Sequence, residues 1–586
     1  MSSFEAASTP YYEDEASRFT VRDLKNLGRY APTCPLRVIA LCDFDAFYSQ
    51  VEAVRLGIDS EQQPLAVLQF KNCIALNYAA KAAGLKRGVS PQDARRQCPG
   101  VLIQHVATWR EGDDSWRYRD VDVKPDMETD KAALDPYRIQ SRRAFELIKK
   151  ILPATPLQKV EKASIDEVFL DLSAQVHARL LDEYPRLNTA LTQDPDSKLP
   201  MPSTSALSWE SSKLIETDDD LENASPDWDD IVLYIGAEIV KDIRAKILAE
   251  LKYTCSAGIA HNKVISKLAS GHNKPNQQTV VRARAVNAFL SQYKLGKIRG
   301  LGGKLGTKAI EAFGTDNIPE LLRLSLKDMQ SKIGASSGTW VHNVIRGIEH
   351  SEVVERTQLQ SMLAAKTFQP RAKDFAQAEK WLTIFAGDLM GRLVEQDATS
   401  VTRRPRVVAL HHAIDGRFGP TRSKQMQIPP GACITRDLLL DLFKTLLTQI
   451  SHEGPTFPCL GLSVSLNSFE DGSSGNSDLK NFFTKRPHDH VAERNIESRE
   501  NMRQRKRKRD SVNYTGLAEK SVKISKTDSI DDSENEHGDS THQQPGNAKD
   551  SAVSVTSLYD CPKCGKSVPD PLEHLDWHVA MELQNG

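Results

Sequence analysis

The sequence lacks the long uncharged apolar run of a membrane-spanning helix, and its N-terminal residues are polar and acidic. A bilayer-spanning helix needs about 20 apolar residues in a row, and a signal peptide needs a basic end followed by an apolar stretch. Closely spaced cysteines are also scarce: among nine in 586 residues, only Cys561 and Cys564 form a CxxC pair. We therefore expect a soluble, intracellular chain whose scattered cysteines are reduced thiols.

The chain also lacks a strong net charge, because 77 Lys and Arg residues nearly balance 78 Asp and Glu residues. The total therefore gives no indication of a nucleic-acid partner. The distribution of charge along the chain does favour such a partner. Segments 1–32, 194–230, 470–557 and 558–586 carry net charges of −1, −9, −1 and −3, so the rest of the chain carries a net charge of +13. The hydrophobic fraction of 39% is ample for packed cores in several domains.

Two pairs of carboxylates stand in apolar, strand-like surroundings. Asp43 and Asp45 follow an apolar run that ends at Cys42, and they would leave the end of a buried strand on one face. Asp166 and Glu167 lie far downstream in similar surroundings. Carboxylates from two separate strands suit a hard divalent cation and phosphoryl transfer. Either pair alone is more often a turn or a helix cap.

The segment 77–98, between the two acidic pairs, is small, polar and basic. Its aromatic and basic members are Tyr78, Lys81, Lys86, Arg87, Arg95 and Arg96. A solvated helical face would have the same composition, but the position between the acidic pairs favours a surface that faces phosphate groups.

A glycine-rich run, in which Gly300, Gly302 and Gly303 precede Lys304, is typical of a helix-hairpin-helix turn. Its glycines would let backbone amides approach a phosphate at a helix start, and the lysine adds positive charge. An ordinary glycine-rich connection between helices is the alternative. Such a turn suits binding to a duplex backbone without reading the base sequence.

The C-terminal segment contains the spacing Cys561-x2-Cys564-x9-His574-x3-His578. These side chains supply four ligands for one tetrahedral zinc ion, and histidines four residues apart share a helical face. A chance cluster in a tail is the alternative. The spacing predicts one zinc ion.

The helix that would carry the zinc-binding histidines is acidic: residues 569–586 contain no Lys or Arg. That is the wrong charge for a helix in a DNA groove. Asp576 and Ala580 lie on another helical face, which suits a protein partner. The stretch 573–583 resembles ubiquitin-binding zinc fingers, which implies ubiquitin as the partner.

Periodicity and composition predict an α+β, multidomain chain. Strands are expected at 38–42, 64–70, 164–172, 253–259, 362–368, 406–411 and 459–466, and helices at 45–56, 137–151, 231–251, 261–270, 376–394 and 436–451. Irregular segments are a flexible leader at 1–32, a charged insertion or long loop at 109–136, a disordered insert at 194–230 and a linker at 471–557.

The two acidic motifs together resemble those of the Y-family of translesion DNA polymerases. The family's "DFDxFYxxVE" motif can be read from Asp43 to Glu52, and its "SIDE" motif from Ser164 to Glu167. The resemblance implies a right-hand polymerase with palm, fingers, thumb and little finger, and a C-terminal ββα-type zinc finger. The implied domains are a palm at 33–70 and 137–280, fingers with an insertion at 71–136, a thumb at 281–350, a little finger at 351–470 and the zinc finger at 558–586.

The resemblance also implies roles for acidic residues. Asp43 and Asp166 would bridge two Mg²⁺ ions, and Glu167 with the Phe44 carbonyl would complete their ligands. Asp45 is expected to be either a helix cap or an outer residue, which lies around the metal ligands without binding the metal itself. Whether Asp166 and Glu167 can share one site depends on a bend in the backbone, because adjacent residues of a regular strand face opposite ways.

The nucleotide contacts implied by the resemblance come from several segments. Tyr48 would lie against the sugar and exclude a 2′-hydroxyl, Tyr78 and Lys274 would contact the triphosphate, and Gln69 and Arg87 would contact the template base and the incoming nucleotide. Lys81 stands where the family usually has arginine, so it keeps the charge but not the bidentate fork.

The linker contains two short motifs. Leu479, Phe482 and Phe483 resemble the motif that binds the sliding clamp PCNA, although Asn476 replaces the usual glutamine; chance apolarity is the alternative. The basic run 503–509 is typical of a nuclear localisation signal or, alternatively, of a tail that binds nucleic acid.

The implied function is DNA-templated nucleotide addition opposite damaged bases, including ultraviolet-induced pyrimidine dimers, by a nuclear enzyme that binds primer-template DNA and dNTP. One alternative is another Y-family member with different lesion preference. Another is a non-catalytic repair scaffold that binds clamp and ubiquitin. A palm-domain nucleotide cyclase would not account for the hairpin and the clamp motif.

Overall fold

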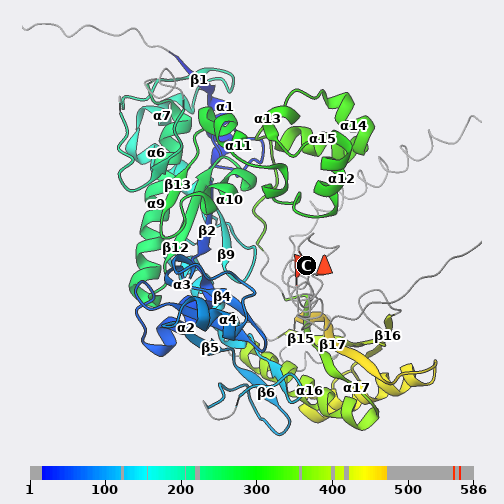
Figure 1. Ribbon diagram of the computed structural model, residues 1–586. Helices are drawn as coiled ribbons and strands as arrows, with labels where there is room; N and C mark the ends of the chain where they lie inside the picture. Colours follow the sequence, from blue (N-terminus) through cyan, green and yellow to red (C-terminus); the bar gives the residue numbers. More distant parts are fainter. Residues whose placement is uncertain are drawn as a thin grey trace, which may run out of the picture. The chain divides into compact units, whose positions relative to one another are not determined.

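The computed structural model describes residues 16–471, apart from 121–123, 155, 205, 218–224, 356–358, 398–402 and 415–420, together with 559–560 and 567–568 (Figure 1). In this part of the chain no helix is long and apolar enough to cross a bilayer. The fold is a mixed α and β arrangement, as expected, with separate cores under separate sheets.

Six strands form the largest sheet, in the order β11-β13-β12-β2-β9-β8. Their bounds are β2 Ile39–Phe44, β8 Val160–Lys162, β9 Glu167–Asp171, β11 Lys213–Leu214, β12 Cys255–Ala260 and β13 Gln278–Val280. The central strands β2 and β12 are buried along their whole length. This explains why their sequences are almost continuously apolar.

Helices α9 (Trp228–Leu251) and α10 (Lys263–His272) cover opposite faces of this sheet. Gly258 lies so close to α10 that an added Cβ would be 2.0 Å from a backbone carbonyl oxygen of that helix. The side chain of the next residue, Ile259, instead lies beside Gly236 of α9. Successive side chains of a strand point to opposite faces, so the two helices are on different sides.

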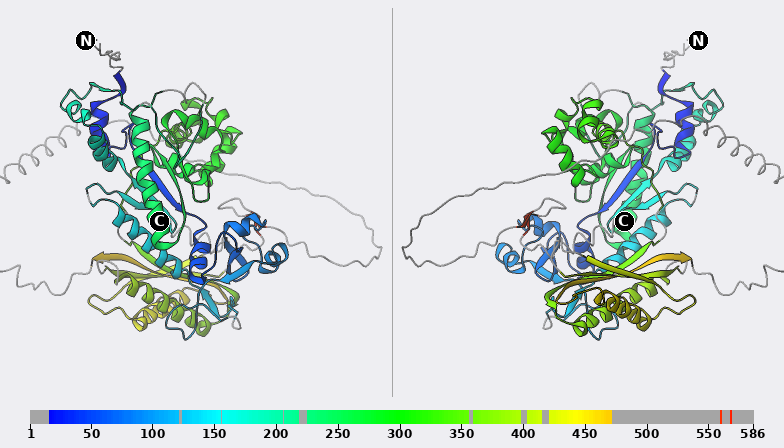
Figure 2. Two further views of the ribbon diagram at one scale, coloured as in Figure 1. Left: turned by 90° about the vertical axis from the view of Figure 1, so that its left-hand side faces the viewer. Right: turned by 90° about the vertical axis from the view of Figure 1, so that its right-hand side faces the viewer.

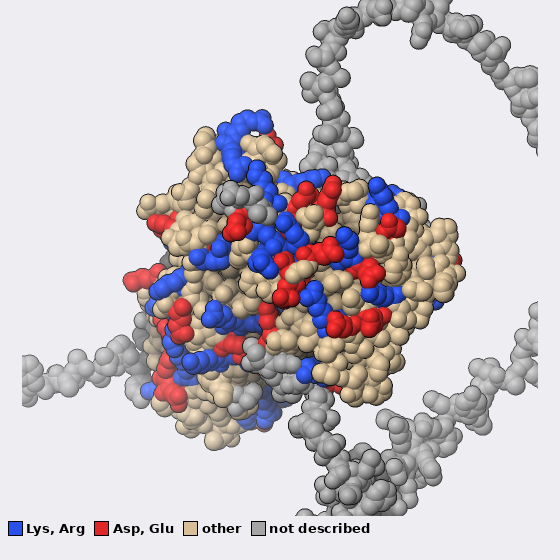
Figure 3. Space-filling model, turned by 90° about the horizontal axis from the view of Figure 1, so that it is seen from below, with Lys and Arg blue, Asp and Glu red and all other residues tan. Residues whose placement is uncertain are grey.

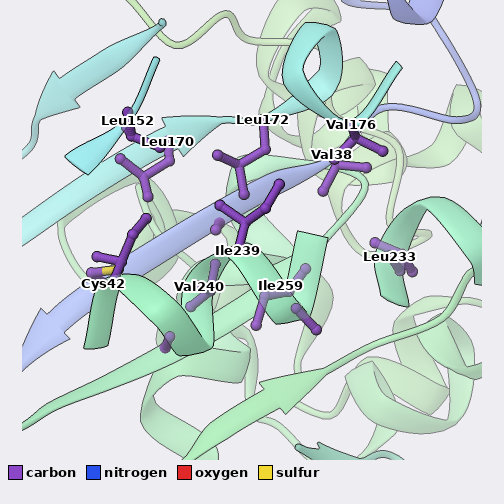
Figure 4. Packing of buried hydrophobic residues seen from close by; sticks show 14 of the residues in the cluster. Val38, Cys42, Leu152, Leu170, Leu172, Val176, Leu233, Ile239, Val240 and Ile259 are labelled. Carbon is purple, nitrogen blue, oxygen red and sulfur yellow. The ribbon is translucent and has the colours of Figure 1, made fainter. Parts of the chain in front are cut away.

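The α9 face carries the main hydrophobic core (Figure 4). Side chains labelled there include Val38, Cys42, Leu170, Ile239, Val240 and Ile259. The α10 face carries Leu41 and Phe169, and Lys263 of α10 lies over the Phe169 ring. Asp43 and Glu167 stand two residues from these positions and therefore point to the α10 face.

Four further helices precede α9 in the sequence, and α5 and α6 pack against it. They are α2 Phe47–Leu56, α5 Asp135–Ile151, α6 Ser173–Glu183 and α7 Arg186–Ala190. The expected helix at 231–251 begins three residues earlier because Asp227 and Asp230 form a capping box at its start.

A separate three-stranded sheet has the order β4-β3-β5. It contains β3 Leu65–Gln69, β4 Asn72–Leu76 and β5 Leu102–His105, with helices α3 Tyr78–Ala82 and α4 Pro91–Gln97. The predicted domain boundary at residue 70 is therefore wrong: the strand expected at 64–70 pairs with β4 and β5 and not with the six-stranded sheet. Periodicity locates a strand but not its partners.

A helical group follows the six-stranded sheet. It consists of η1 Ala283–Ala285, α11 Val286–Ser291, η2 Leu295–Lys297, α12 Lys304–Phe313, α13 Ile318–Leu321, α14 Leu326–Ile333 and α15 Ala335–Val344. These helices share a core with residues of α10.

The last large sheet is antiparallel, in the order β14-β17-β15-β16. Its elements are β14 Ser361–Ala372, α16 Phe375–Asp397, β15 Arg403–Ala413, β16 Thr421–Gln427, α17 Arg436–Ser451 and β17 Cys459–Asp471. Both helices lie on one face of the sheet (Figures 1 and 2). Strand β16 is not among the strands expected from the sequence. Near the C-terminus, β18 (Tyr559–Asp560) pairs with β19 (Ser567–Val568).

The prediction of a flexible leader at 1–32 is wrong for its described part. Strand β1 (Ala16–Thr20) pairs with β10 (Lys198–Pro200), and α1 (Val21–Leu27) buries its apolar face. The prediction of a disordered insert at 194–230 is likewise wrong for its described residues, which include β10, β11 and the cap of α9. Each segment is too polar to form a core alone, so pairing with distant parts of the chain decides its structure.

The expected loop at 109–136 contains a two-stranded sheet, β6 (Thr108–Arg110) with β7 (Asp130–Ala132). Its charged residues pair with one another: Arg110 Nη2 lies 2.6 Å from Asp130 Oδ2. The ring of Trp109 is buried against α16. High charge predicted an insertion or a long loop, whereas ion pairing allows a carboxylate such as Asp130 to be buried.

Candidate active site

Asp43 and Glu167 are directly opposite each other on the antiparallel strands β2 and β9. On the α10 face, Lys267 Nζ lies 2.9 Å from Asp43 Oδ2 and 2.8 Å from Glu167 Oε1. Desolvation lowers the pKa of Lys267, but Asp43 and Glu167 outweigh it and raise the pKa above its ordinary value. Lys267 therefore remains a cation between the two carboxylates.

Lys267 has no assigned role in the sequence-based site, although the predicted helix 261–270 contains it. The sequence did contain an indication of this role, because Lys263 and Lys267 are four residues apart and therefore share a helical face. Only the structure shows that the two lysines have different partners. Lys263 Nζ lies 2.6 Å from Glu161 Oε2 and not beside Asp43.

Asp166 lies in the turn between β8 and β9, just before the regular strand begins. The amide of Phe44 donates to the Asp166 carbonyl oxygen at 2.9 Å, and Ser164 Oγ donates to Asp166 Oδ1 at 2.6 Å. Because Asp166 is outside the strand, strict alternation does not apply. The bend therefore removes the geometric objection to a site shared by Asp166 and Glu167.

The three carboxylates act on one another electrostatically. Burial raises the pKa of Asp166 and of Glu167, and the charge of Asp43 adds to both shifts. Asp43 of β2 thus faces Glu167 at the start of β9, and Asp166 precedes Glu167 near enough for the charge of Asp43 to act on it.

Of the two roles expected for Asp45, a helix cap or an outer residue, the structure excludes the cap. Helix α2 begins at Phe47 after Ala46, without a side-chain cap. Asp45 is 1% exposed and accepts hydrogen bonds from Ser256 Oγ at 2.7 Å and from the Asn276 amide at 2.9 Å. It therefore holds the loop that carries Lys274.

Lys274 reaches the carboxylates from this loop. Its ammonium group forms an ion pair with Asp43 and lies 4.0 Å from Asp45 Oδ1. The predicted nucleotide contact at Lys274 and the predicted metal ligand at Asp43 are therefore neighbours.

Tyr78, Lys81 and Arg87 come from the other side, on and after α3. Burial raises the pKa of Tyr78 to about 12, and Asp45 and Asp43 contribute. Lys81 Nζ lies 4.2 Å from the centroid of the Tyr78 ring, and desolvation together with Lys274 lowers the pKa of Lys81. The charges of Asp43 and Asp45 therefore act on Tyr78, and the charge of Asp45 acts on Lys81.

The remaining predicted nucleotide contacts lie on α2 and β3. Tyr48 stacks on Tyr137 with ring centroids 4.1 Å apart, and burial raises the pKa of Tyr48 to about 12. Desolvation lowers the pKa of Arg87, while Tyr48 and Asp166 act in the opposite direction. Gln69 is half-buried at the end of β3, where it pairs with Asn72.

The predicted hairpin residues lie in the helical group, apart from the carboxylates. Gly300 has a φ of +86° and Gly303 directly precedes α12. Gly302 and Lys304 are exposed. The start of α12 is therefore accessible to a phosphate.

Other predicted sites lie outside the described residues. These are the zinc ligands Cys561, Cys564, His574 and His578, the ubiquitin-facing Asp576 and Ala580, and the clamp motif Leu479, Phe482 and Phe483.

Comparison with known families supports this site. The model of the impB/mucB/samB family matches residues 42–271, which hold both acidic motifs, and its C-terminal domain matches 359–479. The chain belongs to the Y-family of DNA polymerases. Two smaller models match as well: a DNA polymerase eta/Rev1 helix-hairpin-helix motif at 294–348 and a ubiquitin-binding zinc finger at 557–585.

Curated relatives in several organisms resemble this Y-family chain. It is 34% identical to N-acetyltransferase eso1 of Schizosaccharomyces pombe over 97% of the chain, 32% identical to DNA polymerase eta of Arabidopsis thaliana over 77%, and 30% identical to DNA polymerase eta of Drosophila melanogaster over 76%. The matches cover 64%, 66% and 50% of those proteins. The chain thus spans between half and two thirds of their length.

Y-family polymerases use divalent metal ions, and the donor set here fits such an ion. Three carboxylates and the Phe44 carbonyl offer the oxygen atoms that hard cations prefer as ligands. Burial raises the pKa values of Asp166 and Glu167, and the charge of Asp43 raises them further; a cation at the site would favour the charged carboxylates. In the described part of the chain no three acidic, His or Cys side chains enclose a metal position; Asp43 pairs with Lys267 and Lys274.

Proposed function

We propose that this chain is a DNA-directed DNA polymerase that performs translesion synthesis past damaged bases, such as ultraviolet-induced pyrimidine dimers, by two-metal nucleotidyl transfer. The observation that carries the proposal is that Asp43 and Glu167 face each other on β2 and β9 beside Lys274, with Asp166 directly before Glu167 in the chain. The similarity to DNA polymerases eta supports the choice of damaged templates.

Each of the site residues would have a separate role in the reaction. Asp43, Asp166, Glu167 and the Phe44 carbonyl would hold two Mg²⁺ ions, which when bound supply activation of the primer 3′-hydroxyl and neutralise the leaving pyrophosphate. Lys274 would bind the triphosphate. Asp45 positions Lys274 through its hydrogen bond to the Asn276 amide.

The nucleotide would be held from the α2 and α3 sides. Tyr78 and Lys81 would contact the triphosphate, Gln69 and Arg87 the base pair, and Tyr48 the sugar. The ring of Tyr48, pressed on Tyr137 at 4.1 Å, leaves little freedom to yield to a 2′-hydroxyl.

The modules take the following roles in this proposal. The six-stranded sheet is the palm, the three-stranded sheet the fingers, the helical group the thumb and the four-stranded sheet the little finger. Lys and Arg side chains form a band on one face of the molecule, with acidic side chains beside it (Figure 3). The exposed start of α12, at Gly302 and Lys304, would bind a duplex phosphate.

The C-terminal part would bring the enzyme to its place of action. The match to a ubiquitin-binding zinc finger at 557–585 supports one Zn²⁺ ion and ubiquitin binding. We extend the proposal to the sliding clamp PCNA through the motif at 479–483 and to the nucleus through the basic run 503–509.

The test is primer extension by the variant Asp166→Ala with Glu167→Ala, on undamaged templates and on templates with a thymine dimer. Loss of two metal ligands should reduce extension at least about a thousand-fold, while DNA binding persists. A matched control is Asp182→Ala with Glu183→Ala, an adjacent and exposed acidic pair on α6.

Extension retained by the first variant would contradict the catalytic assignment. A native chain that binds DNA but does not extend primers would favour a repair scaffold. Extension that stops at the thymine dimer would favour a Y-family member with another lesion preference.

A further inference from the structure

Glu52, one turn after Tyr48 on α2, is a buried carboxylate with three donors. It is 0% exposed. Its Oε1 accepts from the hydroxyls of Tyr137 at 2.6 Å and Tyr118 at 2.7 Å, and its Oε2 accepts from Arg55 Nε at 2.7 Å. Hydrogen bonds to a charged acceptor are stronger than neutral ones, so this carboxylate fixes the groups around it.

The Tyr137 ring connects this carboxylate to the nucleotide site. Tyr137 is fully buried at the start of α5, and its ring is stacked on Tyr48, tilted by 8°. With its backbone held by the helix and its hydroxyl held by Glu52, the ring has little freedom to move. Tyr48 is thereby supported from behind.

Tyr118 comes from a different part of the fold, the charged segment between β6 and β7. Its ring lies under the Arg55 guanidinium, whose carbon is 3.7 Å from the ring centroid. The segment has its own anchors, including the Arg110–Asp130 ion pair and the buried Trp109. Loss of the Tyr118 hydroxyl would therefore leave the segment's other contacts in place.

Both phenols remain donors at neutral pH. Burial raises the pKa of Tyr137 and of Tyr118 well above the ordinary value, and the charge of Glu52 raises both further.

We propose that Glu52 and Tyr118 are positioning residues for sugar selection, because they hold Tyr137 and, through its ring, Tyr48 against the sugar of the incoming nucleotide. This inference rests on the proposed polymerase function. A displacement of a fraction of an ångström at Tyr48 would open room for a 2′-hydroxyl, and selectivity is sensitive to such small changes in packing.

The experiment compares kcat/KM for a deoxyribonucleotide with kcat/KM for the matching ribonucleotide on an undamaged primer-template. Tyr118→Phe, which removes one hydroxyl, should lower this ratio about five-fold through faster ribonucleotide addition. Glu52→Gln should lower it at least as far. Tyr30→Phe is the matched control, because its hydroxyl donates to the Pro156 carbonyl instead, and its ratio should not change.

The same substitution in a Tyr48→Ala background separates positioning from a general effect. If Tyr118 acts through Tyr48, Tyr118→Phe should have no further effect on the ratio in that background. An unchanged ratio in the native background, or an equal fall in both backgrounds, would overturn this inference alone. Absence of deoxyribonucleotide extension by the native chain would overturn the proposed function and this inference with it.

Discussion

At the scale of residues, Asp43 and Asp45 carry the same charge two positions apart but have different neighbours. Asp43 faces Glu167, Lys267 and Lys274. Asp45 accepts hydrogen bonds from Ser256 and the Asn276 amide. Asp43 therefore lies among the charged residues of the proposed site, whereas Asp45 holds the loop that carries Lys274.

We predict that Asp43→Ala reduces primer extension about a thousand-fold, because it removes a proposed ligand of both metal ions. Asp45→Ala should reduce kcat/KM about ten-fold, chiefly through KM for the nucleotide, because the Lys274 loop loses its hydrogen bonds. Steady-state kinetics on an undamaged template measure both effects. Equal losses would contradict this ranking, and the exposed Asp59→Ala is the control.

The acidic motifs identified these residues from the sequence, but their neighbours were not predictable from it. Asp166 and Glu167 are adjacent in sequence, and only the structure shows that Asp166 lies in the turn before β9, where strict alternation does not apply. Lys267 could be placed on a helical face, yet its approach to Asp43 depends on how α10 packs over the sheet.

At the scale of elements, α9 supports the central strands on the face opposite the carboxylates. Gly236 of this helix packs against Val38, at the approach to β2. The helix begins at a capping box, in which Asp227 accepts from the Trp228 amide at 2.7 Å. Asp227 also accepts from Ser17 Oγ at 2.6 Å, which ties the N-terminal strand to the helix.

We predict that Asp227→Ala lowers the free energy of unfolding by about 1–2 kcal/mol, the usual cost of losing an N-cap. Chemical denaturation followed by circular dichroism measures the loss. Asp242→Ala, at an exposed position in the middle of the same helix, should change stability by less than about 0.5 kcal/mol. A loss at Asp242 as large as that at Asp227 would show that capping is not the cause.

Helices and strands were predictable from the sequence where the hydrophobic periodicity is strong, but the pairing of the strands into sheets was not. The strand at 64–70 was expected, but it belongs to the sheet with β4 and β5. The charged segment around Trp109 indicated a loop, because composition does not show that Arg110 and Asp130 neutralise each other.

At the scale of the whole molecule, several histidines are held neutral by burial. Burial lowers the pKa of His105, His177, His261 and His412. The unfolded chain binds protons at these side chains near the ordinary pKa of about 6.5, whereas the folded chain resists them. Their contribution to stability is therefore complete above about pH 6.5 and is lost as the pH falls below it.

We predict that the thermal midpoint falls between pH 7.5 and pH 5.5, and that it falls less in His412→Gln. His412 is 1% exposed, and its Nε2 lies 2.8 Å from the Thr456 carbonyl oxygen; glutamine keeps an N–H donor but cannot take up a proton in this range. Differential scanning calorimetry at both pH values measures the change. His452→Gln, at an exposed position, should keep the native slope, and an unchanged slope in His412→Gln would contradict the explanation.

The sequence by itself determined the acidic motifs, the zinc spacing, most strands and helices and, through its motifs, the polymerase family, because these depend on local residue types and short periodicities. Only the tertiary structure decided that Asp43 faces Glu167, that Lys267 lies between them and that Glu52 gathers two tyrosines from distant segments. The physical reason is that such contacts depend on which faces pack together across the fold, and hydrophobic burial selects those faces without leaving a local pattern in the chain.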